Sequence, residues 1–275
     1  MKKSRPALIF SSAMLCAAML LTSCSSSDEP KNGGDGDALV NPNAEGTVDA
    51  VTEAPVREEE TEAPVREEGT EAPEVTVPED YIDRLTFLGD STTYGLRYYE
   101  VLEGGKDTTQ VWTPSSGTLS MYSLSAATIV YPETDEQLTI REALTRKQPE
   151  YLVITLGVNG IAAIKEAPFK AAYKSVITTA NEVSPDTKII CQSMYPVASN
   201  YDKLDSINND KISAGNEWIK AVADEMGVHY VDTYSVLIGD DGWLPQEYTN
   251  GDGLHLSPEG FEVVIENLKA NPYIG

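Results

Sequence analysis

A serine that could act as a nucleophile stands in the stretch Leu88-Gly-Asp-Ser-Thr-Thr-Tyr-Gly95. Ser91 follows the apolar, strand-like run 85–88, so we expect it where a strand gives way to a turn. Open α/β sheets bind their ligands outside the carboxyl ends of such strands. A serine hydroxyl is a weak nucleophile at neutral pH, and it needs a base within hydrogen-bond reach and a third group that orients the base.

The strongest candidates for the base and its orienting group lie far downstream, in Gly251-Asp-Gly-Leu-His-Leu-Ser-Pro258. Asp252 and His255 are three residues apart, so a single turn could bring the carboxylate to one imidazole nitrogen while the other nitrogen faces outward. A serine nucleophile requires such an orienting pair. The alternative is a hydrophilic loop ahead of a helix. His229, the second histidine of the chain, lies in a predicted strand, and we interpret it as structural.

Two further residues could stabilise a developing oxyanion. Asn159, in Gly157-Val-Asn-Gly160, follows the apolar run 151–156, and its side-chain amide could donate a hydrogen bond at the same edge of the sheet. An Asn flanked by Gly is also a common turn former, so this interpretation stays open beside the first. Gly117 is a weaker candidate for a second donor, through its backbone N–H.

The elements expected around these residues indicate an α/β fold. Strand-like apolar runs occur at 85–88, 111–112, 151–156, 188–192 and 228–232, with another at 126–131 inside an otherwise irregular region, 104–137. Helical patterns occur at 138–147, 167–183 and 207–226, and a last helix fits Ser257 as N-cap, Pro258 at its first position and Glu259 in its first turn. Apolar strands that alternate with helices predict a parallel sheet of about five strands with both faces covered.

The composition excludes some partners and cofactors. The chain has 275 residues and a formal net charge of -24 at pH 7, which would repel a phosphate backbone, so we expect no nucleic-acid partner. Three Cys and two His, without a Cys-x-x-Cys pair, offer no Cys/His metal site. We therefore expect no cofactor; a calcium site made of carboxylates alone stays open, but no motif supports it.

The N-terminus has the pattern of a bacterial export signal. Basic residues at positions 2, 3 and 5 precede an apolar run, 7–21, that is shorter than the ~20 residues of a membrane span. Leu21-Thr-Ser-Cys24 resembles the lipobox of bacterial lipoproteins, in which the Cys is acylated and becomes the first residue. We expect a signal peptide at 1–23 and a lipid anchor on Cys24, which holds the protein on the extracytoplasmic face of the cell membrane. An ordinary secretory peptide with an incidental Cys is the alternative.

Residues 24–80 are predicted to form a disordered tether, and residues 81–275 a folded domain. Between Ser25 and Asp80 there are 17 Asp and Glu against three Lys and Arg, and Pro, Thr and Ser are frequent. Such a segment buries too little apolar surface to offset its ordering entropy, and charge repulsion should keep it extended. The folded domain retains a net charge near -13.

Taken in order, Gly89-Asp90-Ser91, Gly117, Gly157-x-Asn159 and Asp252-x-x-His255 resemble the four sequence marks of the SGNH (GDSL-like) hydrolase family. The resemblance implies a flavodoxin-like three-layer α/β/α sandwich. It also implies that Ser91 is the nucleophile, His255 the general base and acid, and Asp252 its orienting partner. The backbone N–H groups of Ser91 and Gly117 and the side chain of Asn159 would form the oxyanion hole. Gly160 departs from the family pattern, because many members carry Asp there.

These observations predict a serine esterase that hydrolyses small O-acyl esters, above all O-acetyl, on carbohydrate outside the cytoplasm, and that acts as a monomer. Segments 195–201 and 243–250 mix aromatic and polar residues, which suits sugars better than acyl chains. Five aromatic residues near the motifs could form a platform for sugar rings, or could pack in the core: Tyr94, Trp112, Tyr195, Trp243 and Tyr248. A lysophospholipase or thioesterase of the same fold, and a non-catalytic carbohydrate-binding lipoprotein, are the alternatives.

Overall fold

The computed structural model describes residues 77–274. The predicted signal peptide, the lipid anchor Cys24 and most of the predicted tether, up to residue 76, therefore lie outside the described residues. Near the predicted start of the domain, Tyr81 is buried, and its hydroxyl accepts a hydrogen bond from the backbone N–H of Tyr273 at 3.0 Å. The two ends of the described chain thus meet.

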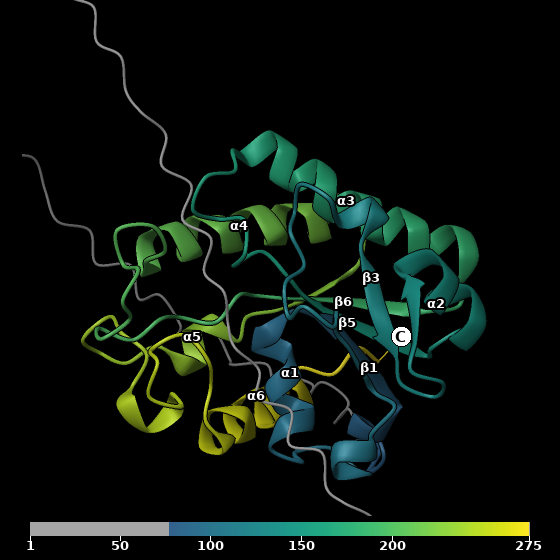
Figure 1. The fold of residues 1–275 in the computed structure, drawn as a ribbon, viewed down its shortest axis with the longest axis horizontal. Helices are drawn as coiled ribbons and strands as arrows, with labels where there is room; N and C mark the ends of the chain where they lie inside the picture. The colour runs from purple at the N-terminus through teal and green to yellow at the C-terminus, as the bar shows by residue number, and fades with distance from the viewer. Residues whose placement is uncertain (1–76, 275) are drawn as a thin grey trace, which may run out of the picture. The chain divides into compact units, whose positions relative to one another are not determined.

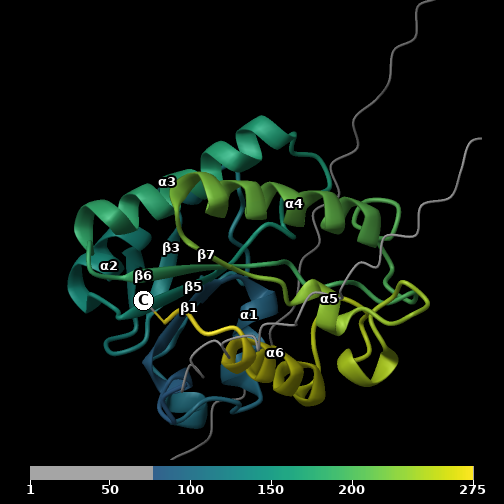
Figure 2. The same cartoon turned by 180° about the vertical axis from the view of Figure 1, so that it is seen from behind.

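A central sheet of five parallel strands has the order β2-β1-β5-β6-β7. Its strands are β1 (Leu85–Gly89), β2 (Val111–Trp112), β5 (Tyr151–Thr155), β6 (Lys188–Gln192) and β7 (His229–Val231). Strands β1, β5 and β6 are labelled in Figure 1, and β7 is labelled in Figure 2. The expected parallel sheet is confirmed. Gly89 and Thr155, the last residues of β1 and β5, are paired, so the segments that follow these two strands begin side by side.

Helices cover both faces of the sheet, as Figures 1 and 2 show from opposite sides. One layer holds α2 (Ile140–Lys147), α3 (Glu166–Val183) and α4 (Asn209–Met226); the other holds α1 (Ser91–Tyr98), α5 (Tyr234–Leu237) and α6 (Pro258–Ala270). Successive strand residues point to opposite faces, so Leu88 packs in one apolar cluster and Phe87 in the other. The predicted three-layer α/β/α sandwich is confirmed.

The irregular region contains a separate hairpin of β3 (Thr128–Tyr131) and β4 (Glu136–Thr139). The helix predicted from residue 138 was wrong at its start, because Leu138 and Thr139 belong to β4. Thr139 then caps α2: its hydroxyl accepts from the backbone N–H of Glu142, and the Glu142 carboxylate accepts from the backbone N–H of Thr139. Four short 3-10 turns complete the described elements, at Ile82–Arg84, Gly105–Asp107, Leu124–Ala126 and Gln246–Tyr248.

Helix α1 is one of the elements that sequence patterns did not predict, as are the short helix α5 and strand β4. Ser91 was expected in a turn, but it is the first residue of this helix, with Asp90 as N-cap. Every helix between residues 77 and 274 is too short or too polar to span a bilayer.

Candidate active site

The three residues expected to form a catalytic triad lie together at the carboxyl edge of the sheet. The Ser91 hydroxyl lies 2.9 Å from His255 Nε2, although 164 positions separate the two residues in sequence. His255 Nδ1 lies 2.7 Å from Asp252 Oδ2. A proton on Nδ1 satisfies the carboxylate and leaves Nε2 free to accept the serine proton, which is the arrangement that activates a serine.

Backbone hydrogen bonds hold the carboxylate of Asp252 in place. Its Oδ1 accepts from the backbone N–H of Leu254 at 2.8 Å and of His255 at 2.9 Å. Desolvation raises the pKa of Asp252, but the hydrogen bonds from the His255 backbone, the His255 ring and the Leu254 backbone outweigh it, and the net pKa is lowered. Asp252 is therefore ionised at neutral pH and can stabilise an imidazolium.

The loop that carries Asp252 and His255 is closed on itself and fixed to the fold. Thr249 and Leu256 form an antiparallel bridge across its base, just before Ser257 caps α6. At its tip, the Gly253 carbonyl accepts from the backbone N–H of Ala198 at 2.8 Å. These contacts explain why a loop residue, His255, lies in a defined position against α1.

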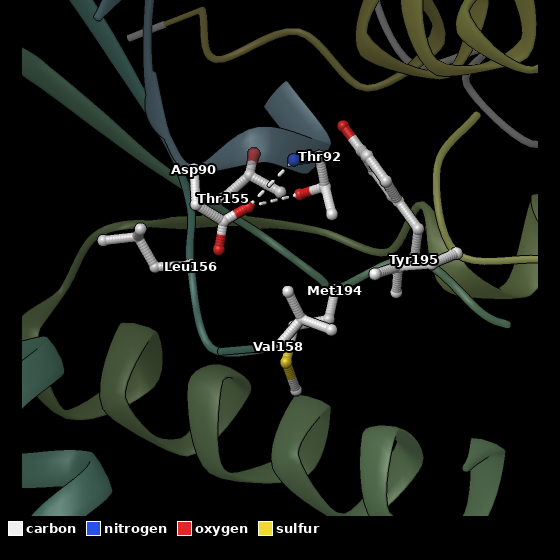
Figure 3. A pocket seen from close by; sticks show the side chains of 8 residues that line it. Asp90, Thr92, Thr155, Leu156, Val158, Met194 and Tyr195 are labelled. Carbon is white, nitrogen blue, oxygen red and sulfur yellow. Dashed lines mark hydrogen bonds between the residues drawn. The ribbon is translucent and has the colours of Figure 1, made fainter. Parts of the chain in front are cut away.

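Asp90 holds the start of α1 and was not singled out from the sequence. Its side chain is 0% exposed, and Oδ1 accepts from the backbone N–H of Thr92 at 3.0 Å and from the Thr92 hydroxyl at 2.8 Å (Figure 3). Burial raises the pKa of Asp90, while its hydrogen bonds act in the opposite direction without cancelling that effect. The cap sets the direction of the first turn of α1 and with it the position of Ser91.

Asn159, the predicted side-chain oxyanion donor, contacts the same carboxylate. Its Nδ2 donates to Asp90 Oδ2 at 2.7 Å, across 69 positions of sequence. One amide proton is therefore bound to Asp90, and the second is available to a ligand on the exposed side. The Gly-Asp-Ser motif contains Asp90, but only the pairing of β1 with β5 brings it to Asn159.

Gly117 lies next to Ser91, with the left-handed φ of +74° that glycine adopts without strain. Its carbonyl accepts the Ser91 N–H at 2.7 Å, and its own N–H donates to the Pro114 carbonyl at 3.0 Å. Both backbone N–H groups expected in the oxyanion hole thus have partners in this arrangement. The Gly117 carbonyl has to move away from Ser91 before the Ser91 N–H can bind a substrate oxygen.

Two hollows meet at this site. One, of about 370 Å³, contains Ser91 and His255 and is bounded by Leu256 and Phe261. The other, of about 760 Å³, contains Gly117. The side chains of Tyr94 and Tyr98 border both hollows. The cavity of Figure 3, behind Asp90, measures only about 10 Å³, room for a single water at most.

The expected aromatic platform is only partly present. Trp112 and Tyr195 are 0% and 5% exposed and pack in the core, so the expectation was wrong for these two residues. Tyr248 borders a groove along α6 and is absent from the linings of both hollows, as is Trp243. Tyr94, at 45% exposed, is the predicted aromatic that lines the site.

The other potentially reactive side chains lie apart from this centre. His229 Nε2 lies 3.1 Å from the Asn271 carbonyl, and its ring stacks on Tyr273. Cys191 is a buried free thiol in β6, and burial raises its pKa to about 12. Over residues 77–274, no group of three or more His, Cys, Asp or Glu is arranged to hold a metal ion.

A comparison with protein-family models decides the family. The model of the GDSL-like Lipase/Acylhydrolase family matches residues 87–263, which is more than half of the chain and includes every member of the site from Asp90 to His255. The chain belongs to this family. It is an ester-hydrolysing enzyme.

Solved structures agree with this family assignment at the level of the fold. A GDSL-like lipase from Bacteroides thetaiotaomicron shares 23% identity with a TM-score of 0.53, over 71% of this chain and 90% of that one. A protein of Bacteroides fragilis assigned as an acylhydrolase also shares 23% identity, with a TM-score of 0.54, over 72% of this chain and 89% of that one. No curated protein matches the chain.

The structure explains the departure from the family pattern at Gly160. A Cβ atom at this position would lie 2.9 Å from Met121 Cγ and 3.1 Å from Met121 Cβ, closer than side chains normally pack. Met121 belongs to the same connection between β2 and β3 as Gly117. The absence of a side chain at residue 160 therefore lets this connection lie against the turn that carries Asn159.

Proposed function

We propose that Ser91, His255 and Asp252 form the catalytic triad of this esterase. The observation that carries the proposal is the continuous chain of hydrogen bonds from the Ser91 hydroxyl through both nitrogens of His255 to Asp252. The Ser91 oxygen attacks the ester carbonyl while His255 Nε2 takes its proton. The tetrahedral intermediate then collapses, and the protonated His255 returns the proton to the departing alcohol.

A water molecule completes the cycle. His255 removes its proton as it attacks the acyl-enzyme, and a second tetrahedral intermediate releases the carboxylic acid and restores Ser91. In both steps the negative oxygen is stabilised by the free amide proton of Asn159. The N–H groups of Ser91 and Gly117 add to this once Ser91 N–H has left the Gly117 carbonyl and Gly117 N–H has left the Pro114 carbonyl. Donors held in position for a developing oxyanion form one of the largest contributions to this type of catalysis.

The substrate in this proposal is a small O-acyl ester, above all O-acetyl, on carbohydrate outside the cytoplasm. The exposed rings of Tyr94 and Tyr98 border both hollows and offer faces against which sugars can stack. The cavity behind Asp90 has room for a single water at most, so no acyl chain extends into the fold there. The predicted acylation of Cys24 and the acidic tether support a position at the membrane surface.

A lysophospholipase or thioesterase is the second candidate, and one observation favours it. Tyr99, Leu256 and Phe261 line the hollow that holds Ser91, and their apolar surfaces could receive an acyl chain. The hollow is partly open to solvent, and the polar side chain of Asn250 also borders it.

A series of 4-nitrophenyl esters from acetyl to octanoyl, with acetylated xylan and mannan and a lysolipid beside it, separates the two candidates. We expect kcat/KM to fall steeply with acyl length, and the acetylated polysaccharides to release acetate. Ser91→Ala and His255→Ala should each remove nearly all activity, and the double variant should be little worse, because the groups act as a unit. Hydrolysis of lysolipid in preference to every acetylated sugar would establish the second candidate instead.

A further inference from the structure

The larger hollow gives a substrate bound at Ser91 a second direction in which to extend. It shares Tyr94 and Tyr98 with the hollow that contains His255, and it reaches the nucleophile at Gly117, whose carbonyl oxygen is 2.7 Å from Ser91 N. With about 760 Å³, it is wide enough for more than one sugar ring. A polymer whose ester lies at Ser91 can therefore place a neighbouring group in this hollow.

Arg97, in the last turn of α1, lines the hollow. It is half-buried, and its Nε donates to the Lys106 carbonyl at 2.7 Å. This bond uses one of the five N–H groups of the side chain. No carboxylate among residues 77–274 forms an ion pair with the rest of the guanidinium group. Its two terminal nitrogens therefore retain donors for a ligand.

The other arginines of the described chain are used differently. Arg84, Arg141 and Arg146 each form an ion pair with a glutamate on the surface. Lys106 and Asp107 also line the hollow. Lys106 pairs with Glu100, and no ion pair joins Asp107 to Arg97. Arg97 is thus the described arginine that faces a cavity without an acidic partner, in a domain whose net charge is near -13.

We propose that Arg97 binds a carboxylate of the substrate, so that the preferred substrate is an O-acetylated acidic saccharide. The inference rests on the proposed esterase function of Ser91 and adds a specificity subsite to it. A guanidinium group matches a carboxylate through two parallel N–H···O bonds, whereas a neutral sugar offers only hydroxyl groups. Ser115 and Ser116 border the same hollow, and their hydroxyl groups can bond to the ring substituents of that sugar.

Two matched probes test this subsite: the O-acetylated methyl glycosides of galactose and of galacturonic acid, which differ only in having CH2OH or a carboxylate at C6. The full chain, purified in detergent, should show a higher kcat/KM on the acidic probe. Arg97→Gln should lower the ratio of acidic to neutral kcat/KM roughly tenfold, as expected for the loss of a charged hydrogen bond. The change should lie in KM. Arg97→Lys should give an intermediate ratio, and Arg141→Gln should leave it unchanged.

Ser116→Glu provides a second test if Arg97→Gln does not fold, because a carboxylate at the rim should lower the same ratio. The proposed subsite is contradicted if the wild type has equal kcat/KM on both probes, or if Arg97→Gln lowers kcat/KM on both probes by the same factor. A stronger preference for the corresponding galactose 6-phosphate probe would overturn the choice of a carboxylate. If the wild type hydrolyses neither probe nor 4-nitrophenyl acetate, the proposed function itself fails, which is a distinct result.

Discussion

At the residue scale, Asp90 joins the stability of the fold to the geometry of the site. Its buried carboxylate accepts two hydrogen bonds from Thr92 and one from Asn159. Because burial raises the pKa of Asp90 in the folded protein, the folded state binds its proton more readily than the unfolded chain does. The contribution of Asp90 to stability is therefore greatest below the unfolded pKa of about 3.9 and declines as pH rises through the folded pKa.

Asp90→Asn should remove this pH dependence. We expect the stability of the variant relative to the wild type to increase as pH rises from about 4 towards neutrality, because the variant no longer buries a charge. Urea unfolding of both proteins at several pH values measures the difference. If the stability of Asp90→Asn relative to the wild type is constant with pH, or increases on acidification, the assigned environment of Asp90 is contradicted.

The same variant should lower kcat, because Asn159 loses the acceptor that orients its amide. Asn159→Ala is the reference, with an expected loss of about 10²–10³ in kcat for one oxyanion donor. We expect Asp90→Asn to reproduce a large part of that loss in kcat, with a small change in KM. A normal kcat for Asn159→Ala would leave Asn159 as a turn residue.

At the element scale, long and strongly patterned segments were predictable, and the short helices α1 and α5 were not. The runs that became β1, β5 and β6 are mostly apolar and almost entirely buried, and α3 and α4 show clear helical periodicity. Helix α1 was missed because Thr, Tyr and Gly are weak helix formers. Its stability comes from the Asp90 cap and from packing against neighbouring elements.

The residues of the site also fall into two groups, those that sequence patterns predicted and those that they did not. Ser91, Asp252 and His255 could be proposed from motif spacing, because a turn before a helix brings positions three apart together. The contact of Asp90 with Asn159 and the hydrogen bond of Ser91 with Gly117 join distant segments, so no local pattern reports them. Arg97 carried no signal, since its importance depends on a hollow between α1 and the connection that follows β2.

The contact between Gly160 and Met121 gives an element-scale prediction. Gly160→Asp should push Met121 and the connection that carries Gly117 away from Ser91, lowering kcat and reducing the free energy of unfolding by about 1–3 kcal/mol, as overpacking does. Adding Met121→Ala should restore part of the lost kcat and part of the lost free energy of unfolding, because it makes room for the new side chain. Kinetics and urea unfolding of the two single variants and the double variant measure the coupling. Additive losses would show that the two positions do not interact.

At the scale of the whole molecule, the position of the enzyme is proposed from its N-terminus. Cys24→Ser should release the protein from the membrane fraction and leave the specific activity of the folded domain unchanged, because Cys24 lies far from the motifs in sequence. Fractionation of cells that express each form, followed by an esterase assay, measures both effects. Wild-type protein that is fully soluble in the culture fluid without proteolysis would contradict the lipid anchor.

The central claim is that Ser91 is the nucleophile and that His255 activates it. Treatment of the full chain with a serine-directed organophosphonate, followed by peptide mass spectrometry, tests it most directly. In the wild type we expect one adduct, on Ser91, that forms at the same rate as esterase activity is lost. The adduct should form much more slowly in His255→Ala and should not form in Ser91→Ala. An adduct on another residue, or complete inactivation with Ser91 unmodified, would contradict the account.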